Sequence, residues 1–172
     1  MRLAFFQRDI DVLSRLVPFA TGTVAAILTV VPTPMPGLAV ATPAFALMAI
    51  CHWTVYRPDL LPPSGVFLIG ILLDLLAGTP YIGLSALTLL IARGLVLAAR
   101  RHIVKQSFAI VWAGFAVVAA AVIGLEWLLI GGLNATLVGS RPFLFQIVVT
   151  VAAFPLVSYL LTQIQRASLS RL

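Results

Sequence analysis

Apolar residues fill six long runs that short polar or proline-containing segments separate. The runs cover residues 16–31, 38–56, 64–78, 81–99, 107–131 and 143–162. A helix rises ~1.5 Å per residue and the hydrocarbon core of a bilayer is ~30 Å thick, so runs of about this length predict membrane-spanning helices. The run 64–78 is shorter than the others, and we expect it to begin earlier or to lie where the bilayer is locally thin. The pattern therefore predicts an all-α membrane protein with six transmembrane helices.

The first fifteen residues differ from the rest of the chain. From Met1 to Val17, apolar side chains recur at steps of three and four, at Leu3, Phe6, Ile10, Leu13 and Val17. This spacing puts them on one face of a helix, which favours an amphipathic helix over 1–15 that lies on the cytoplasmic membrane surface. A frayed or partner-bound tail is the alternative. With the six spans and a short cytoplasmic tail at 163–172, the whole chain 1–172 is predicted to form a single integral membrane domain.

Positive charges gather in alternate loops. With the N-terminus inside, nine Lys and Arg residues fall in cytoplasmic segments: Arg2, Arg8, Arg15, Arg57, Arg100, Arg101, Lys105, Arg166 and Arg171. Only Arg141 falls in an outer loop, and Arg93 lies inside a run. Because short cytoplasmic loops are enriched in Lys and Arg, this bias predicts that both termini are cytoplasmic.

Composition narrows the classes of function. The chain is 62% hydrophobic and only 9% charged, where soluble domains are roughly 45–50% apolar. Its net charge of +6 sits in short loops beside the apolar runs, which favours contact with anionic membrane lipids and argues against nucleic acid as a partner. The single cysteine, Cys51, provides no metal-binding spacing and no internal disulfide. We expect no cofactor and no metal.

Three charged residues lie well inside apolar runs: Asp74, Arg93 and Glu126. A central charge costs roughly 2.5–3.5 kcal/mol by insertion scales, so each should face protein or water and have a partner. The Arg93 side chain is placed to snorkel toward the cytoplasm. Glu126 lies toward the outer side, where Arg141 is a candidate partner for Glu126 or for Asp74.

Asp74 stands four residues after Gly70 and four before Gly78. Positions i, i+4 and i+8 share a helix face, and glycines at this spacing let another membrane helix approach closely. Gly70, Asp74 and Gly78 therefore predict a face for helix packing or for partner contact.

Enzymatic activity is not expected, although two membrane carboxylates could in principle exchange protons. His52 and His102 fall near the cytoplasmic ends of their segments, and no Ser or Cys lies in a nucleophile motif. Binding or transport of a small solute stays open, because a six-helix bundle with buried acids could hold one. Trp53 and the other tryptophans are expected as anchors at the membrane interface.

The middle of the chain resembles a known family. The resemblance rests on RPDLLPP at 57–63, GILLDLLAG at 70–78 and PYIGLSAL at 80–87, together about thirty residues. In this order the segments resemble the rod shape-determining protein MreD family of bacteria. Chain length and the predicted six spans agree with that family.

The resemblance implies a non-enzymatic scaffold of the cell-elongation machinery in the bacterial inner membrane. The implied partners are the bitopic protein MreC, the actin-like MreB filament, and the peptidoglycan synthase formed by RodA and a class B penicillin-binding transpeptidase. Asp74 would hold a helix junction on which this assembly depends, and Arg57 and Pro58 would shape the cytoplasmic entry. The family is also similar in fold to substrate-binding subunits of energy-coupling-factor transporters, which keeps a small-molecule-binding or transport subunit as the alternative.

Overall fold

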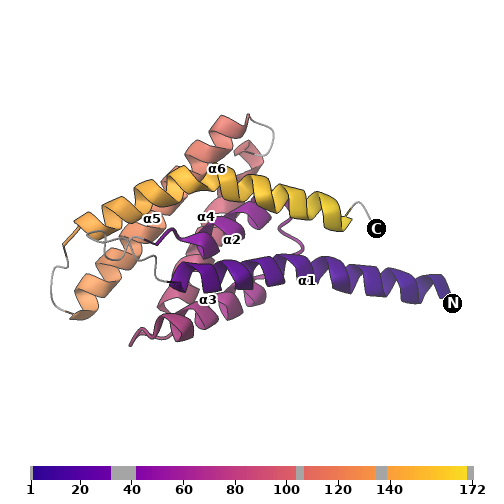
Figure 1. Ribbon diagram of the computed structural model, residues 1–172, viewed down its shortest axis with the longest axis horizontal. Helices are drawn as coiled ribbons and strands as arrows, with labels where there is room; N and C mark the ends of the chain where they lie inside the picture. Colours follow the sequence, from indigo (N-terminus) through magenta and orange to yellow (C-terminus); the bar gives the residue numbers. More distant parts are fainter. Residues whose placement is uncertain (1, 32–41, 104–106, 135–138, 170–172) are drawn as a thin grey trace.

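The computed structural model describes residues 2–31, 42–103, 107–134 and 139–169 (Figure 1). The elements are α1 (Arg2–Val30), α2 (Phe45–Tyr56), α3 (Pro63–Ala77), α4 (Leu84–Ile103), α5 (Phe108–Asn134) and α6 (Arg141–Leu169). Every regular element in these ranges is a helix, so the all-α fold is confirmed for them.

The N-terminal segment is helical. Residues 2–15 and the first apolar run are one continuous helix, α1, which passes through Pro18 without ending. The helix expected over 1–15 is therefore present as the first part of α1, and its position on the membrane surface stays a prediction. The start of α1 and the end of α6 lie on the same side of the molecule (Figure 1).

Other helix bounds also differ from the expected runs. The second helix begins only at Phe45, and part of the expected run 38–56 lies outside the described residues. α4 continues into the basic segment after residue 99, while α5 and α6 extend beyond the runs 107–131 and 143–162. Phe108–Leu133 and Arg141–Arg166 are long and apolar enough to cross a membrane, whereas Leu16–Val30, Phe45–Tyr56 and Pro63–Ala77 are shorter apolar helices. The count of six spans therefore stays a prediction.

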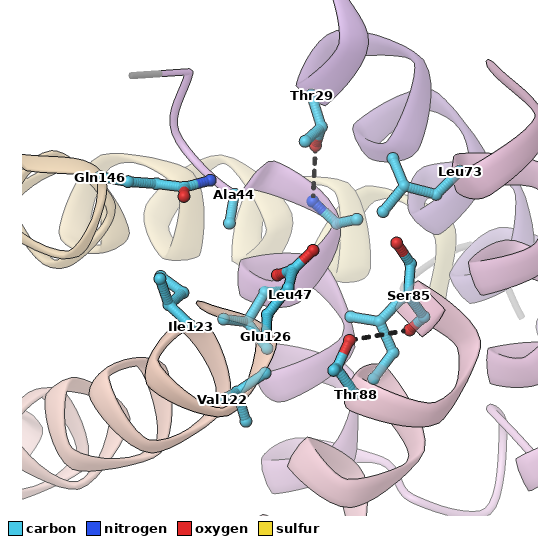
Figure 2. A pocket seen from close by; sticks show the side chains of 12 residues that line it. Thr29, Ala44, Leu47, Leu73, Ser85, Thr88, Val122, Ile123, Glu126 and Gln146 are labelled. Carbon is cyan, nitrogen blue, oxygen red and sulfur yellow. Dashed lines mark hydrogen bonds between the residues drawn. The ribbon is translucent and has the colours of Figure 1, made fainter. Parts of the chain in front are cut away.

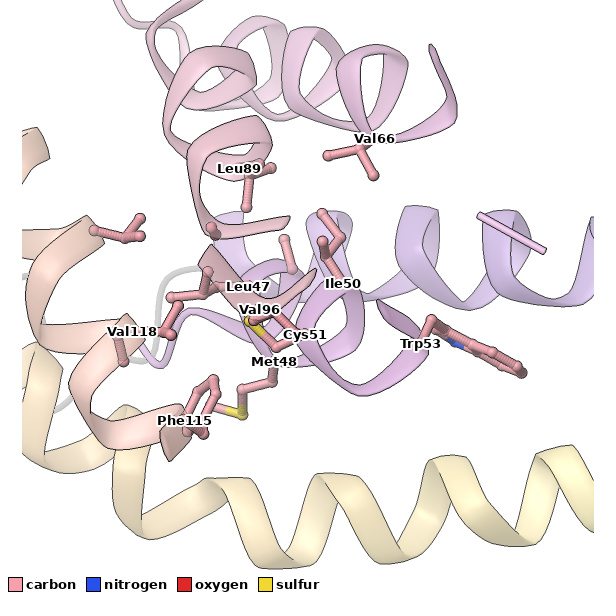
Figure 3. Packing of buried hydrophobic residues seen from close by; sticks show 14 of the residues in the cluster. Leu47, Met48, Ile50, Cys51, Trp53, Val66, Leu89, Val96, Phe115 and Val118 are labelled. Atoms are coloured by element: carbon pink, nitrogen blue, oxygen red, sulfur yellow. The ribbon is translucent and has the colours of Figure 1, made fainter. Parts of the chain in front are cut away.

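The short helix α2 is the centre of the bundle. It is apolar on all sides, which is typical of a helix that protein surrounds completely, and each residue from 46 to 55 is buried. It packs against α1, α4 and α6. Figure 3 shows Leu47, Met48 and Cys51 of α2 in the same cluster as Val96 of α4 and Phe115 of α5.

Neighbouring helices satisfy the buried ends of α2. At its start, the Ala46 N–H donates to Thr29 Oγ1 of α1 and the Ala44 N–H donates to Thr150 Oγ1 of α6, both at 3.1 Å. At its end, Arg100 Nε of α4 donates to the Val55 carbonyl at 2.9 Å. Terminal N–H and C=O groups have no partner within their own helix, so these side chains replace the missing hydrogen bonds. They also fix where α2 sits between α1, α4 and α6.

A proline inside α6 creates a similar need. Pro155 has no N–H, so the carbonyl four residues earlier, at Val151, loses its normal helical donor. Trp112 Nε1 of α5 donates to this carbonyl at 2.9 Å. A tryptophan expected as an interfacial anchor thus repairs a proline break and ties α5 to α6.

We predict that W112F lowers the free energy of unfolding by about 1–3 kcal/mol, because it leaves the Val151 carbonyl without a donor. In a P155A background, the N–H of residue 155 can donate to the Val151 carbonyl. W112F should then lower the free energy of unfolding by a smaller amount. Thermal unfolding of the four variants in one detergent gives this double-mutant cycle. Equal costs in both backgrounds would show that the tryptophan acts through packing alone.

Candidate functional site

The candidate site is the hairpin that joins α3 to α4. Gly78 ends α3 with φ of 62°, the left-handed conformation in which glycine commonly stops a helix. The Thr79 N–H returns to the Asp74 carbonyl at 3.3 Å. Gly83, with φ of 101°, precedes α4, and its carbonyl accepts the Leu87 N–H at 2.9 Å. Two left-handed glycines therefore set the path between the helices.

Asp74 caps the start of α4 from the preceding helix. Its carboxylate is 1% exposed, and it accepts the Gly83 N–H at 2.7 Å and the Ser85 N–H at 3.1 Å through separate oxygens. The first N–H groups of a helix lack acceptors, and a negative charge is favourable beside them. Two hydrogen bonds to main-chain donors thus stabilise the buried Asp74.

Gly70 brings α3 into contact with the α4 backbone. A Cβ atom at Gly70 would lie 2.3 Å from Ala86 Cα and 2.7 Å from Ala86 N. The close approach that the glycine pattern predicts is therefore present at Gly70. At Gly78 a Cβ would meet nothing within 4 Å, so that glycine serves the turn and not the packing.

These positions separate the two roles expected for this face, helix packing and partner contact. Gly70 and Asp74 are buried against α4 of the same chain. Their packing contacts therefore lie within the chain, and partner contact at this face stays a prediction. Gly70 and Asp74 therefore form an internal junction of the hairpin, whereas Gly78 is exposed at its turn.

The charged residues expected near this site have other surroundings. Arg141 is exposed at the start of α6, and no ion pair joins it to Asp74 or Glu126 in the described structure. Arg93 Nε donates to the Leu61 carbonyl at 3.3 Å and so reaches the turn between α2 and α3. The expected pairing of a carboxylate with Arg141 is therefore replaced by contacts with main chain and, for Glu126, with a cavity.

Arg57 and Pro58 belong to the turn between α2 and α3. Arg57 is the C-cap of α2, and its N–H donates to the Trp53 carbonyl at 2.7 Å. Its own carbonyl accepts the Leu60 N–H at 3.2 Å. The following Pro58 cannot continue the helix, so these residues set the entry into α3.

Sequence reasoning missed a polar cluster around α2. His52 is buried, and its Nδ1 lies 3.1 Å from Ser158 Oγ of α6. Trp53 is 1% exposed and donates through Nε1 to Thr21 Oγ1 of α1 at 2.9 Å. The interfacial reading of Trp53 is therefore wrong. The signal in the sequence was a hydroxyl side chain within each neighbouring apolar run, Thr21 in 16–31 and Ser158 in 143–162.

Glu126 faces a cavity of about 70 Å³ that residues of all six helices or their ends line. Among the described residues, no group of three or more His, Cys, Asp or Glu side chains is placed to hold a metal ion. The best-defined polar site is the Asp74 cap. Both of its carboxylate oxygens accept main-chain N–H groups, so Asp74 stabilises the fold.

We predict that D74N lowers the free energy of unfolding by about 2–3 kcal/mol, because the amide loses the charge and presents a donor where an acceptor is needed. D59N is the matched control, since Asp59 is exposed in the turn after α2, and it should change stability by less than about 0.5 kcal/mol. Thermal unfolding in detergent compares the two. Equal effects would contradict the capping role.

We predict that G70A costs about 3 kcal/mol or more, because its Cβ would overlap main-chain atoms of Ala86 that cannot move aside alone. G78A should cost only about 1–2 kcal/mol, from left-handed strain without overlap. A86G should not rescue G70A, since the closest atoms belong to the backbone. Membrane accumulation and thermal unfolding measure all three, and full rescue by A86G would contradict the backbone contact.

Comparison with known proteins gives one result for the whole chain. A family model described as rod shape-determining protein MreD matches residues 10–165 of 172, a range that reaches from α1 to α6 and includes the hairpin. No curated protein and no solved structure matches, so similarity to energy-coupling-factor subunits stays a prediction. Family membership and the two long apolar helices indicate a membrane protein with a role in rod-shape determination, in a family not known for enzymes. The chain belongs to the MreD family of rod shape-determining proteins.

Proposed function

We propose that this protein is a non-enzymatic scaffold of the cell-elongation machinery, with six spans in the bacterial inner membrane and both termini in the cytoplasm. The observation that carries the proposal is the family match over residues 10–165. The distribution of Lys and Arg supports the orientation. The partners are MreC, the MreB filament directly or through MreC, and RodA with its class B penicillin-binding transpeptidase.

Partner contacts would run through the outer faces of the helices. Large apolar side chains are exposed on α1 and on α3 to α6, among them Val24, Leu75 and Leu160, and they face lipid or protein in a membrane. Asp74 and Gly70 lie inside the hairpin, so they support the shape of these faces without touching a partner. The scaffold therefore depends on Asp74 through the fold.

A groove beside α1 and α6 is the best surface for the single membrane helix of MreC. It encloses about 360 Å³, and its wall contains only apolar surface from α1, the start of α2 and α6. On the α1 side, the lining residues Ala20, Thr21 and Ala25 have small side chains. Small residues let membrane helices approach closely, where association depends on van der Waals contact. A bitopic partner offers one such helix within the bilayer.

The scaffold is favoured over a small-molecule-binding or transport subunit by the size of the polar cavity beside Glu126. Its volume is about 70 Å³. Sites for drug-sized ligands enclose roughly 300–1,000 Å³. The larger groove at α1 and α6 has no polar surface to orient a solute.

We predict that a photoreactive residue at Val24 or Leu160, in the groove, captures MreC in living cells. The matched controls are Leu68 and Leu75 on α3, which are similarly exposed at 56% and 60% but lie outside the groove. Mass spectrometry identifies the adducts. Capture of MreC only from α3, or from none of the four positions, would overturn the proposed groove contact.

A further inference from the structure

Glu126 reaches from α5 into the interior of the bundle. Its carboxylate lies in a cavity of about 70 Å³, with Ser85 and Thr88 of α4 to one side and Gln146 of α6 to the other (Figure 2). Thr29 and the first residues of α2 close another side. No donor or cation among the described residues pairs with this carboxylate.

The polar groups of the wall present mainly acceptors. Thr88 Oγ1 donates its hydrogen to the Ser85 carbonyl at 3.1 Å, which leaves its lone pairs free. Gln146 Nε2 donates to the Thr42 carbonyl at 3.4 Å, so its Oε1 remains as an acceptor. Thr29 likewise donates to the Ala25 carbonyl at 2.8 Å. The cavity therefore holds a carboxylate and further oxygens that can act as ligands, while the Ser85 hydroxyl and the second Gln146 N–H remain as donors.

An ionised carboxylate at Glu126 requires a positive charge beside it. Asp74 does not compete for it, since its oxygens accept the Gly83 and Ser85 N–H groups. Glu126 is therefore the carboxylate that faces the cavity, and one monovalent cation balances its charge. Oxygen ligands of this kind suit hard cations. A volume of about 70 Å³ also leaves space for a few waters, at ~10–15 Å³ of such volume for each.

We propose that Glu126, Ser85, Thr88 and Gln146 form a binding site for a monovalent alkali-metal cation inside the bundle. The cation would join α5 to α4 and α6 beside the start of α2. Because a ligand that binds only the folded protein stabilises it by mass action, the site would couple the stability of the bundle to the cation concentration. This binding is independent of partner proteins, so its test does not depend on the scaffold proposal.

Purified protein in detergent tests the site, with sodium chloride titrated against choline chloride at constant ionic strength. We expect a saturable rise in Tm, by about 5–10 °C at a hundredfold excess over the half-saturating sodium concentration. E126Q keeps the shape of the side chain and should remove the response. T88V should raise the half-saturating concentration about tenfold, because it removes one oxygen ligand.

D59N is the matched control, because it removes an exposed carboxylate far from the cavity in sequence and should keep the full sodium response. No saturable response in the unmodified protein, or an equal response in E126Q, would overturn the proposal. A response to pH that depends on Glu126, without any response to sodium, would also overturn it and would assign a proton to the carboxylate.

Discussion

The structure depends on one constraint: helix ends and breaks that lie inside an apolar bundle still need hydrogen-bond partners. A backbone group left unpaired in such surroundings costs several kcal/mol, and lipid offers no replacement. Asp74 meets this need at the start of α4, and Thr29 with Thr150 meets it at the start of α2. Arg100 meets it at the end of α2. Several of the few polar side chains of an apolar chain thus serve the main chain of another helix.

These contacts also decide how the helices are arranged, because each polar side chain and its main-chain partner belong to different helices or turns. Trp112 fixes α5 against the proline break of α6, and Arg93 fixes α4 against the turn before α3. Apolar packing alone is tolerant of sliding, whereas a hydrogen bond to one carbonyl is not. The polar contacts therefore define the register of a bundle whose volume is filled by apolar side chains.

The sequence predicts the helical class and singles out Asp74, because a charge inside an apolar run needs a reason. It could not identify the partner of Asp74, since main-chain N–H groups carry no residue identity, and Arg141 was the nearest charge on the expected topology. Glycine was equally ambiguous: Gly70 permits a close contact and Gly78 permits a left-handed turn, although both fit one stripe. Only the path of the chain separates these roles.

The internal position of Asp74 changes what a functional defect at this residue would mean. In a scaffold with short loops, partners recognise the outer faces of helices, and those faces keep their relative positions only while the hairpin stays closed. The contact between Gly70 and Ala86 holds α3 and α4 together at backbone distance. A change at Asp74 would displace α4 against α3 and would affect partner binding only through that displacement. Glu126 differs, because its carboxylate meets a cavity and no main-chain donor among the described residues. The two intramembrane acids therefore have separate roles: one completes the fold, and the other leaves a charge for a ligand to complete.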